Sequence, residues 1–163
     1  MNQGVHTVDL LLWLLGDVTA VQAQMKSALH KIESEDTLTA LLEFANGTMG
    51  TFIATTSIYP GYPRRIELSG SEGTAILEND RVIYADLKTP LAEPLPAEDA
   101  DKSPSASSPL VSDIRGHKAI LEDFVRAIQK NSQPACDGTE GRRSVALVET
   151  IYQAARTGKR ILM

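Results

Sequence analysis

The dipeptide Asn46-Gly47 stands between two β-prone segments, residues 37–44 and 48–58, and constrains the fold more than any other feature of the sequence. Asn-Gly favours the type I′ turn of a β-hairpin, because both central residues of that turn need a positive φ. In the first segment every second residue from Leu38 to Phe44 is apolar, which leaves the other face mixed and rich in threonine. The pair predicts an antiparallel hairpin with one face for the core and one for solvent or a partner.

Further strands are predicted on either side of this hairpin, over residues 18–28, 64–70, 74–78 and 81–87. Glycine, serine and asparagine in residues 70–73 and 78–80 mark two more tight turns. Residues 89–113 are rich in proline and serine, and they predict a long loop within a single domain that covers residues 1–163. The strands together indicate an antiparallel sheet in the middle of the chain.

Three helices are predicted around this sheet. The first covers residues 4–15 and ends at Gly16, which can take a positive φ. The second begins near Gly116 and has apolar residues at helical spacing. The third starts at Asp137, with a glutamate three residues later as in a capping box, and ends at Gly158. Its predicted buried stripe consists of Val145, Val148, Ile151, Tyr152 and Ala155. The fold class predicted is α+β: a predominantly antiparallel β-sheet with helices packed on one face and the other face open for oligomerisation.

The composition excludes several classes of protein. With 163 residues and a formal net charge of −5, the chain lacks the clustered cations that nucleic-acid binding needs. Its longest apolar run, Leu10 to Leu15, is far shorter than the roughly 20 residues of a membrane-spanning helix. The one cysteine, Cys136, cannot form an internal disulfide or a Cys-x-x-Cys zinc cluster, and we interpret it as a small buried hydrophobe. No secretory signal is visible, so we expect a cytoplasmic protein with no nucleic-acid, membrane or metal partner.

The polar residues of the first helix fall on one side of it. At about 100° per residue, Asn2, His6, Asp9 and Trp13 lie within about 60° of one another. Apart from one threonine, the rest of the circumference is valine and leucine, which predicts a helix buried nearly all round. Unpaired buried polar groups cost about 1–3 kcal/mol each, so this polar wedge must face water, a partner or a ligand cavity.

The wedge has the chemistry of a proton-transfer site. Histidine has an unperturbed pKa of about 6.5 and can accept and return a proton near neutral pH, which makes His6 a candidate acid/base. Asp9, one turn further on, could orient the imidazole or bind a substrate hydroxyl. The structural alternative is that Asn2 caps the helix, that His6 is an ordinary structural histidine and that Asp9 is solvated. The spacing by itself leaves both interpretations open.

Three segments resemble a known family in the right order along the chain: NQGVHTVDLLLWLLGDV, TTSIYPGYPRRIELSGSEGTAILE and GHKAILEDFVRAI with DGTEGRRSVALVETIYQAARTGKR. They resemble the carboxy-terminal domain of the glucose-fructose oxidoreductase / inositol dehydrogenase / MocA-like family of NAD(P)-dependent oxidoreductases. Members of this family also have an amino-terminal Rossmann domain that binds the nicotinamide cofactor. This chain contains no G-x-G anywhere, so we expect the Rossmann domain to be absent and the chain alone to bind neither NAD nor NADP.

The resemblance implies a function and a set of site residues. The function is hydride transfer between nicotinamide and a sugar, nucleotide sugar or polyol, in an enzyme that associates through its sheet as a homo-oligomer. Asn2, His6 and Asp9 fall on the family's catalytic positions, although many polyol dehydrogenases have aspartate where this chain has Asn2. The lysine of the family's Glu-Lys-Pro motif lies in the missing half. The NQG-x-H variant resembles the branch that acts on sugars, including nucleotide sugars.

Substrate-binding candidates outside the first helix are Tyr59, Tyr62, Arg64 and His117. Aromatic rings and a guanidinium suit a sugar or a phosphate. The alternatives are a rigid Pro/Gly turn with surface tyrosines and, for the histidine, an ordinary position on a helix surface. For Arg142 and Arg143, on the last helix, we expect a surface or intersubunit salt bridge rather than an anion-binding site.

Two functions remain open on the sequence. The first is the substrate-binding half of an NAD(P)-dependent dehydrogenase, either as a fragment or as a reading frame that has lost its cofactor domain. The second is a non-catalytic, self-associating remnant. An independent hydrolase is disfavoured, because no serine or cysteine lies in a recognisable nucleophile motif such as G-x-S-x-G.

Overall fold

The computed structural model describes residues 4–79, 81–90 and 114–163, apart from the side chain of Arg115. The first helix and the first three strands are α1 (Gly4–Leu15), β1 (Val18–Lys26), β2 (Thr37–Phe44) and β3 (Met49–Thr55). Three strands follow, β4 (Arg65–Gly70), β5 (Gly73–Glu78) and β6 (Arg81–Leu87). The last elements are α2 (Arg115–Lys130), α3 (Gly138–Thr157) and β7 (Ile161–Leu162). The predicted helices and strands are confirmed to within a few residues, and the short β7 is an addition that the sequence patterns did not indicate.

The described strands form two antiparallel sheets, where the sequence indicated one. One sheet has the order β3-β2-β1-β7 and the other the order β4-β5-β6. The chain divides accordingly into two compact units, of which the first comprises Met1–Ile58 and Ser112–Met163 and the second Tyr59–Val111. The α+β class predicted from the sequence is confirmed.

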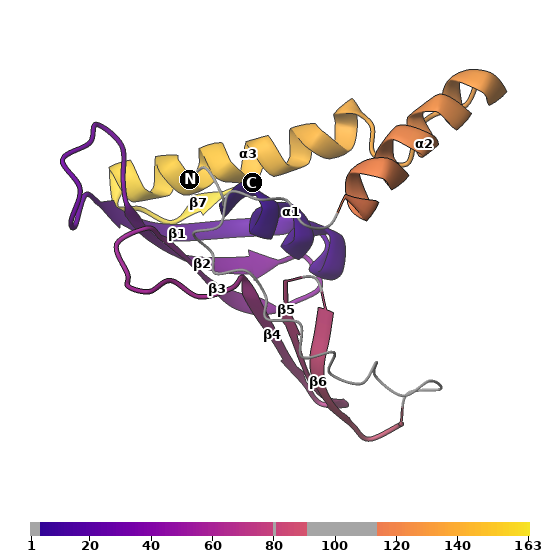
Figure 1. Cartoon of the computed structure of the whole chain (residues 1–163). Coiled ribbons are helices and arrows are strands. Elements are labelled where there is room, and N and C mark those ends of the chain that lie inside the picture. The colour runs from indigo at the N-terminus through magenta and orange to yellow at the C-terminus, as the bar shows by residue number, and fades with distance from the viewer. Residues whose placement is uncertain (1–3, 80, 91–113) are drawn as a thin grey trace. The chain divides into compact units, whose positions relative to one another are not determined.

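The core of the first unit lies between the four-stranded sheet and two helices. α3 runs along one face of this sheet, with α1 beside it (Figure 1). Strand β2 alternates as predicted, since Leu38 and Leu42 point into the core while Thr39 and Leu41 are exposed on the opposite face. The largest fully buried side chains are Leu38, Leu42, Leu147, Ile151, Val8 and Val21. Burial contributes about 1.5–3 kcal/mol for each such side chain, so this core fixes α1 and α3 against the sheet.

The β2–β3 hairpin is confirmed, but its turn is not of type I′. Gly47 has a φ of +85°, whereas Asn46 is not among the residues with positive φ. The N–H of Gly47 donates to the carbonyl of Phe44 at 2.9 Å. Asn46 Oδ1 accepts the N–H of Thr48 at 2.9 Å, and Asn46 Nδ2 donates to the carbonyl of Leu15 at 3.0 Å. The asparagine therefore stabilises the turn and the end of α1 through its side chain, without a positive φ of its own.

Helix α3 begins and ends as predicted, and its buried face overlaps the predicted one only in part. Asp137 accepts the N–H groups of Thr139 and Glu140 at 2.8 and 3.1 Å, and Gly158 ends the helix with a φ of +65°. The buried residues of this helix are Ser144, Leu147, Ile151 and Ala154, whereas Val145 is exposed. Of the predicted stripe, Ile151 is buried, Val148 and Tyr152 pack against the core and Ala155 is half-buried, so the prediction is wrong at Val145 and omits Ser144, Leu147 and Ala154. Apolar residues occur on both sides of α3, so contact with the sheet and α1, rather than the pattern, selects the buried face.

Helix α2 forms where predicted, yet its apolar side chains are not covered. The only residue of this helix that is buried, among those the structure describes, is Ala127. The expectation that helices pack on the sheet thus holds for α1 and α3, whereas α2 leaves its apolar residues exposed. Cys136 is also exposed, against the prediction, because it lies in the surface connection between α2 and α3. No helix in the described part of the chain is long and apolar enough to cross a membrane.

The second unit is built on two tight turns, of which the first is confirmed in full. Gly70 pairs with Gly73 across the turn between β4 and β5. Gly73 has a φ of +146°, and a Cβ at this position would collide with the carbonyl oxygen of Asp86 and with Leu87. Glycine fits at position 73 because it tolerates this positive φ and has no Cβ that would collide. The second predicted turn contains Asp80, which lies outside the described residues.

Candidate functional site

The polar wedge of α1 is exposed, as the helical spacing predicts. His6, Asp9 and Trp13 are the exposed residues of this helix, and Trp13 is 77% exposed. Asn2, the fourth member of the wedge, lies outside the described residues. The prediction that α1 is buried nearly all round is wrong, because only Val8 and Leu12 are buried and most other apolar side chains are half-buried. The helix packs through the side of Val8 and Leu12, and the wedge is exposed next to that side, with Asp9 in contact with α3.

Asp9 is fixed by the last helix. The hydroxyl Oγ of Ser144, which is buried in α3, donates to Asp9 Oδ1 at 2.6 Å. A hydrogen bond to a charged oxygen is shorter and about twice as strong as a neutral one. His6 has no hydrogen-bond partner among the described residues, so its imidazole does not donate to Asp9, which was one of the two roles considered for this carboxylate. The carboxylate is instead oriented by a residue 135 positions away in the sequence.

The residue before Ser144 makes a second connection to the end of α1. Arg143 donates to Asp17 at 2.8 Å and to Glu140 at 2.7 Å. These hydrogen bonds, first to Asp17 and then to Glu140, raise the pKa of the Arg143 guanidinium above its ordinary value. The salt bridge predicted for this arginine is thereby confirmed. Arg143 and Ser144, consecutive residues of α3, thus hold the turn after α1 and the middle of α1, so the wedge is fixed relative to α3.

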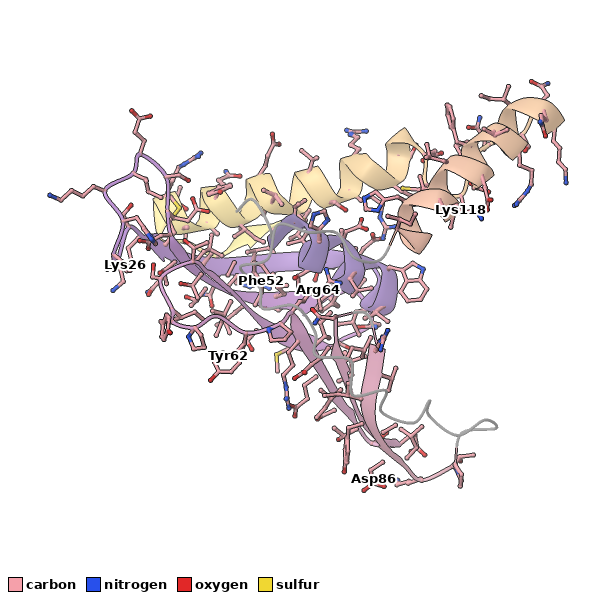
Figure 2. The ribbon with its side chains drawn as sticks, viewed as in Figure 1. Lys26, Phe52, Tyr62, Arg64, Asp86 and Lys118 are labelled. Carbon is pink, nitrogen blue, oxygen red and sulfur yellow. The ribbon has the colours of Figure 1, made fainter. Side chains whose placement is uncertain are left out.

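The aromatic candidates lie on the connection between β3 and β4. Tyr59 is 97% exposed, Tyr62 is exposed, and Arg64 is half-buried beside the start of β4 (Figure 2). The carbonyl of Arg64 accepts the N–H of Asn79 at 3.1 Å, which ties this connection to the end of β5. These three residues belong to the second compact unit, while His6 and Asp9 belong to the first. The structure therefore groups the candidates in two sets, each placed within its own unit.

The remaining candidate, His117, is exposed in the first turns of α2. It has no hydrogen-bond partner among the described residues. It lies on the side of the helix that also carries Leu121, Phe124 and Ile128, since positions three, four and seven apart share a helix face. The neighbours of His117 on this helix face are apolar and do not by themselves form a polar substrate site.

The buried carboxylate of Asp36, directly before β2, was not predicted from the sequence. This side chain accepts the backbone N–H groups of Ala28, Leu29 and His30 at 2.6–2.8 Å. Burial by itself would raise the pKa of Asp36, but these hydrogen bonds, with one from Ser57, outweigh it and hold the pKa far below its ordinary value. The group orders the β1–β2 connection and is structural. An aspartate directly before a buried strand was the available signal.

Ser144 also was missed, although its signal is clear in retrospect. A serine that occurs one turn from Leu147 and two turns from Ile151 lies on the same helix face as both. If that face is buried, the hydroxyl needs a hydrogen-bond partner. The partner could not be named from the sequence, because Asp9 is on a different helix.

The described residues do not fit a nicotinamide dinucleotide. Every strand pairing among them is antiparallel, so they contain no parallel β-α-β unit of the kind that binds dinucleotides. The N-terminus of α3, where a pyrophosphate could bind, is occupied by the carboxylate of Asp137. Residues 4–79, 81–90 and 114–163 contain no group of three or more histidine, cysteine, aspartate or glutamate side chains that could hold a metal ion.

An open hollow of about 430 Å³ lies in the second unit, near the β4–β5 turn. Its polar side chains come mainly from β6 and the segment after it, and Asp86 is labelled in Figure 2. None of the candidate residues lines this hollow, which is formed by Gly70, Ser71, Gly73, Thr74, Tyr84, Asp86, Leu87 and Lys88. We therefore place the candidate site on α1 and not in the hollow.

Comparison with protein families gives a match over the amino-terminal part of the chain, slightly less than half of it, which contains α1 and the hairpin. Residues 1–76 match the model of the GFO/IDH/MocA C-terminal domain. This part of the chain is similar to the GFO/IDH/MocA C-terminal domain. The resemblance inferred from the three sequence segments is thereby confirmed, and the wedge of α1 lies inside the matched region.

Curated relatives and solved structures extend the match to nearly the whole chain. D-apiose dehydrogenase from Rhizobium rhizogenes is 25% identical over 97% of this chain and 46% of its own length. Inositol 2-dehydrogenase from Rhizobium meliloti is 24% identical over 96% of this chain and 47% of its own length. The crystal structure of the WlbA dehydrogenase from Bordetella pertussis, in complex with NADH and UDP-GlcNAcA, is 31% identical with a TM-score of 0.78, and the match covers 100% of this chain and 44% of WlbA. The chain thus spans about half the length of the relatives it matches.

Proposed function

We propose that this chain is the substrate-binding part of an NAD(P)-dependent oxidoreductase that acts on a sugar, nucleotide sugar or polyol. The observation that carries the proposal is the exposed pair His6 and Asp9 on α1, fixed to α3 through Ser144 within a region similar to the GFO/IDH/MocA C-terminal domain. The cofactor is held outside the described residues of this chain. When bound, it exchanges a hydride with the carbon that bears the reacting hydroxyl.

The residues of α1 have separate tasks in this proposal. His6 takes the proton of the reacting hydroxyl through its imidazole and returns it in the reverse reaction. Asp9 uses Oδ1 for Ser144, while its other oxygen, Oδ2, has no partner among the described residues and can accept a hydrogen bond from a second hydroxyl. Asn2 would orient a hydroxyl through its amide without carrying its proton.

Trp13 gives the wedge an apolar end. His6 and Trp13 are separated by seven residues, which is about 10 Å along a helix and suits a ligand of one or two sugar rings. An exposed indole can stack on the apolar C–H face of such a ring. Tyr59, Tyr62, Arg64 and His117 stay substrate-binding candidates from the sequence; the first three belong to the second unit, and the binding proposed here rests on α1. A nucleotide sugar such as the one in the WlbA complex is one member of the proposed class.

We also propose that the chain is a homo-oligomer through the face of the four-stranded sheet that α1 and α3 do not cover. Leu41 and Ile53 are exposed on neighbouring strands of this face, together with Thr39 and Thr51. Large apolar side chains exposed on an uncovered sheet face are typical of an interface. Arg160 and Glu43 form a bidentate ion pair at 2.7 and 2.8 Å, which neutralises both charges.

The test uses the fluorescence of Trp13, because it is the only tryptophan in the sequence and lies beside the proposed acid/base. UDP-GlcNAcA, D-apiose and myo-inositol are titrated into the full chain, and at least one should change the emission saturably. Asp9→Asn should weaken that binding by about tenfold, which is about 1.4 kcal/mol. His30→Ala, a histidine in the β1–β2 connection, is the matched control and should bind as the parent does.

The catalytic part is tested in the chain joined to a nucleotide-binding domain. There, His6→Ala should lower the single-turnover rate of hydride transfer by about 10²–10⁴-fold, the usual contribution of positioned proton transfer, with little change in substrate affinity. Rates within threefold of the parent would rule out His6 as the acid/base. If no sugar binds and the joined protein is inactive while the chain still self-associates, the non-catalytic remnant is the correct function.

A further inference from the structure

The hairpin turn between β2 and β3 contains the dipeptide that loses its side-chain amide most readily in water. Asn46 is the only asparagine in the sequence that is followed by a glycine. In such a pair the backbone nitrogen of the glycine attacks Cγ of the asparagine, because glycine has no side chain to hinder the approach. Both Asn46 and Gly47 are exposed, so water can reach the turn. The turn is therefore a candidate site of spontaneous deamidation.

The reaction at this turn needs water as its only co-reactant. The nitrogen of Gly47 forms a bond to Cγ of Asn46 and closes a succinimide ring, while the bond between Cγ and Nδ2 breaks. Nδ2 leaves as ammonia and takes up the proton that the glycine nitrogen gives up. Water then opens the ring at either of its carbonyls, which leaves aspartate or isoaspartate at position 46.

Hydrogen bonds of the folded turn oppose this ring closure. The N–H of Gly47 donates to the carbonyl of Phe44 at 2.9 Å. Asn46 Nδ2 donates to the carbonyl of Leu15 at 3.0 Å, and Asn46 Oδ1 accepts the N–H of Thr48 at 2.9 Å. Ring closure removes both donors, because the glycine nitrogen loses its proton and Nδ2 leaves. Since these bonds belong to the folded chain, folding should raise the barrier of the reaction.

The same amide fastens the hairpin turn to the end of α1. The last four carbonyls of a helix have no partner within it, and Asn46 Nδ2 supplies a donor to that of Leu15. Beside this contact, the N–H of Ala45 donates to the carbonyl of Asp17 at 2.8 Å. Gly16 lies between the two contacts and has a φ of +85°. The end of α1 is thus held by the turn that carries the reaction.

Deamidation replaces this attractive contact with a repulsive one. A carboxylate at position 46 has no N–H, so the carbonyl of Leu15 loses its donor. The new negative charge also lies at the C-terminal end of a helix, where the partial charge of the helix is already negative. Arg143, the cation at this end of α1, already donates to Asp17 at 2.8 Å and to Glu140 at 2.7 Å. The product should therefore separate the turn from the helix.

We propose that Asn46 is a deamidation site that folding suppresses, and that its product detaches the end of α1 from the hairpin. Asn46 acts on the wedge through α1, as a positioning residue, because Trp13 lies in the last turn of this helix. The modification loosens the exposed side of α1 as the protein ages or whenever the hairpin opens. The proposal rests on the contacts of the turn and is independent of the proposed function.

The first measurement compares deamidation of the full chain in buffer and in guanidinium chloride above its unfolding midpoint, both at mildly alkaline pH. Mass spectrometry of peptides detects the exchange of an NH group for oxygen and assigns it to Asn46. We expect the reaction to be at least about tenfold slower in the folded chain, which is about 1.4 kcal/mol. Gly47→Ala is the control for the chemistry: in the unfolded chain it should slow the reaction, because its Cβ hinders ring closure.

The second measurement introduces the product directly with Asn46→Asp. Hydrogen exchange in the last turn of α1 should become at least about fivefold faster and the emission of Trp13 should shift, whereas exchange in the middle of α3 should stay as in the parent. Asn46→Ser removes the Nδ2 donor without adding a charge, and should have a smaller effect in the same direction. Asn131→Asp is the matched control, since it makes the same chemical change at the C-cap of α2 and should leave α1 unaffected.

Three results would overturn the proposal. One is a rate of deamidation at Asn46 that is the same in the folded and the unfolded chain. Another is exchange in the last turn of α1 that stays at the parent rate in Asn46→Asp. The third is faster exchange throughout α1 and α3 in this variant, because the amide would then support the whole fold and not position the end of α1. Failure of every sugar to bind would contradict the proposed function and leave these outcomes unchanged.

Discussion

The hydrogen bond from Ser144 to Asp9 can be tested by removing the hydroxyl with Ser144→Ala. A hydrogen bond to a charged group contributes about 1.5–3 kcal/mol, and the lower end applies here because Asp9 is exposed and water can replace the lost donor. Alanine is a better helix former than serine by about 0.5 kcal/mol, which offsets part of the loss. We therefore expect the free energy of unfolding to fall by about 1 kcal/mol, and the melting temperature by about 2–4 °C for a chain of this size.

The assay is urea unfolding, followed by far-UV circular dichroism and by Trp13 fluorescence. Trp13 lies one turn after Asp9 on α1, so its emission reports the helix that the hydrogen bond holds. Thr139→Ala is the control, since it removes an exposed hydroxyl from the first turn of the same helix as Ser144. In a double-mutant cycle with Asp9→Asn, the two changes should show a coupling of at least about 0.5 kcal/mol. A loss below about 0.3 kcal/mol for Ser144→Ala, or additive effects in the cycle, would show that this contact does not position Asp9.

Three further predictions concern the rest of the fold. The folded-state pKa of Asp36 is depressed, so the ionised carboxylate stabilises the fold above the ordinary carboxyl pKa, and this stabilisation is lost as the pH falls below about 4. Between pH 7 and pH 3 the urea midpoint should therefore fall more steeply in the parent than in Asp36→Asn. Parallel curves would contradict this. Gly73→Ala should speed hydrogen exchange in β4 and β5, because a Cβ at this position has no room. Gly47→Ala should have the smaller effect on the β2–β3 hairpin, because a Cβ at position 47 meets no atom within 4 Å. Light scattering should show the parent as a dimer or larger at high micromolar concentration and Leu41→Glu shifted towards the 17.7 kDa monomer; a monomeric parent would count against the sheet interface.

The candidate site was only partly accessible to sequence reasoning. The wedge of His6, Asp9 and Trp13 follows from one helix and its period of 3.6 residues, and all three side chains are exposed as this period predicts. The hydrogen-bond partner of Asp9 does not follow, because Ser144 is 135 positions away and nothing local connects the two residues. From the sequence, Asp9 could orient the imidazole or bind a substrate hydroxyl, and only the structure shows that its Oδ1 is held from α3.

The sequence by itself determined the helices and strands, their approximate ends and the antiparallel class of the sheet. These depend on interactions within a few residues: the alternation in β2, the glycine at position 47, the Asp137 cap and the Gly158 stop. Only the tertiary structure decided that α3 buries Leu147 rather than Val145, that the strands divide into two sheets, and that the apolar side of α2 is left exposed. A helix with apolar residues on two sides can bury either, and the choice is made by the surfaces available to pack against it, which no local pattern contains.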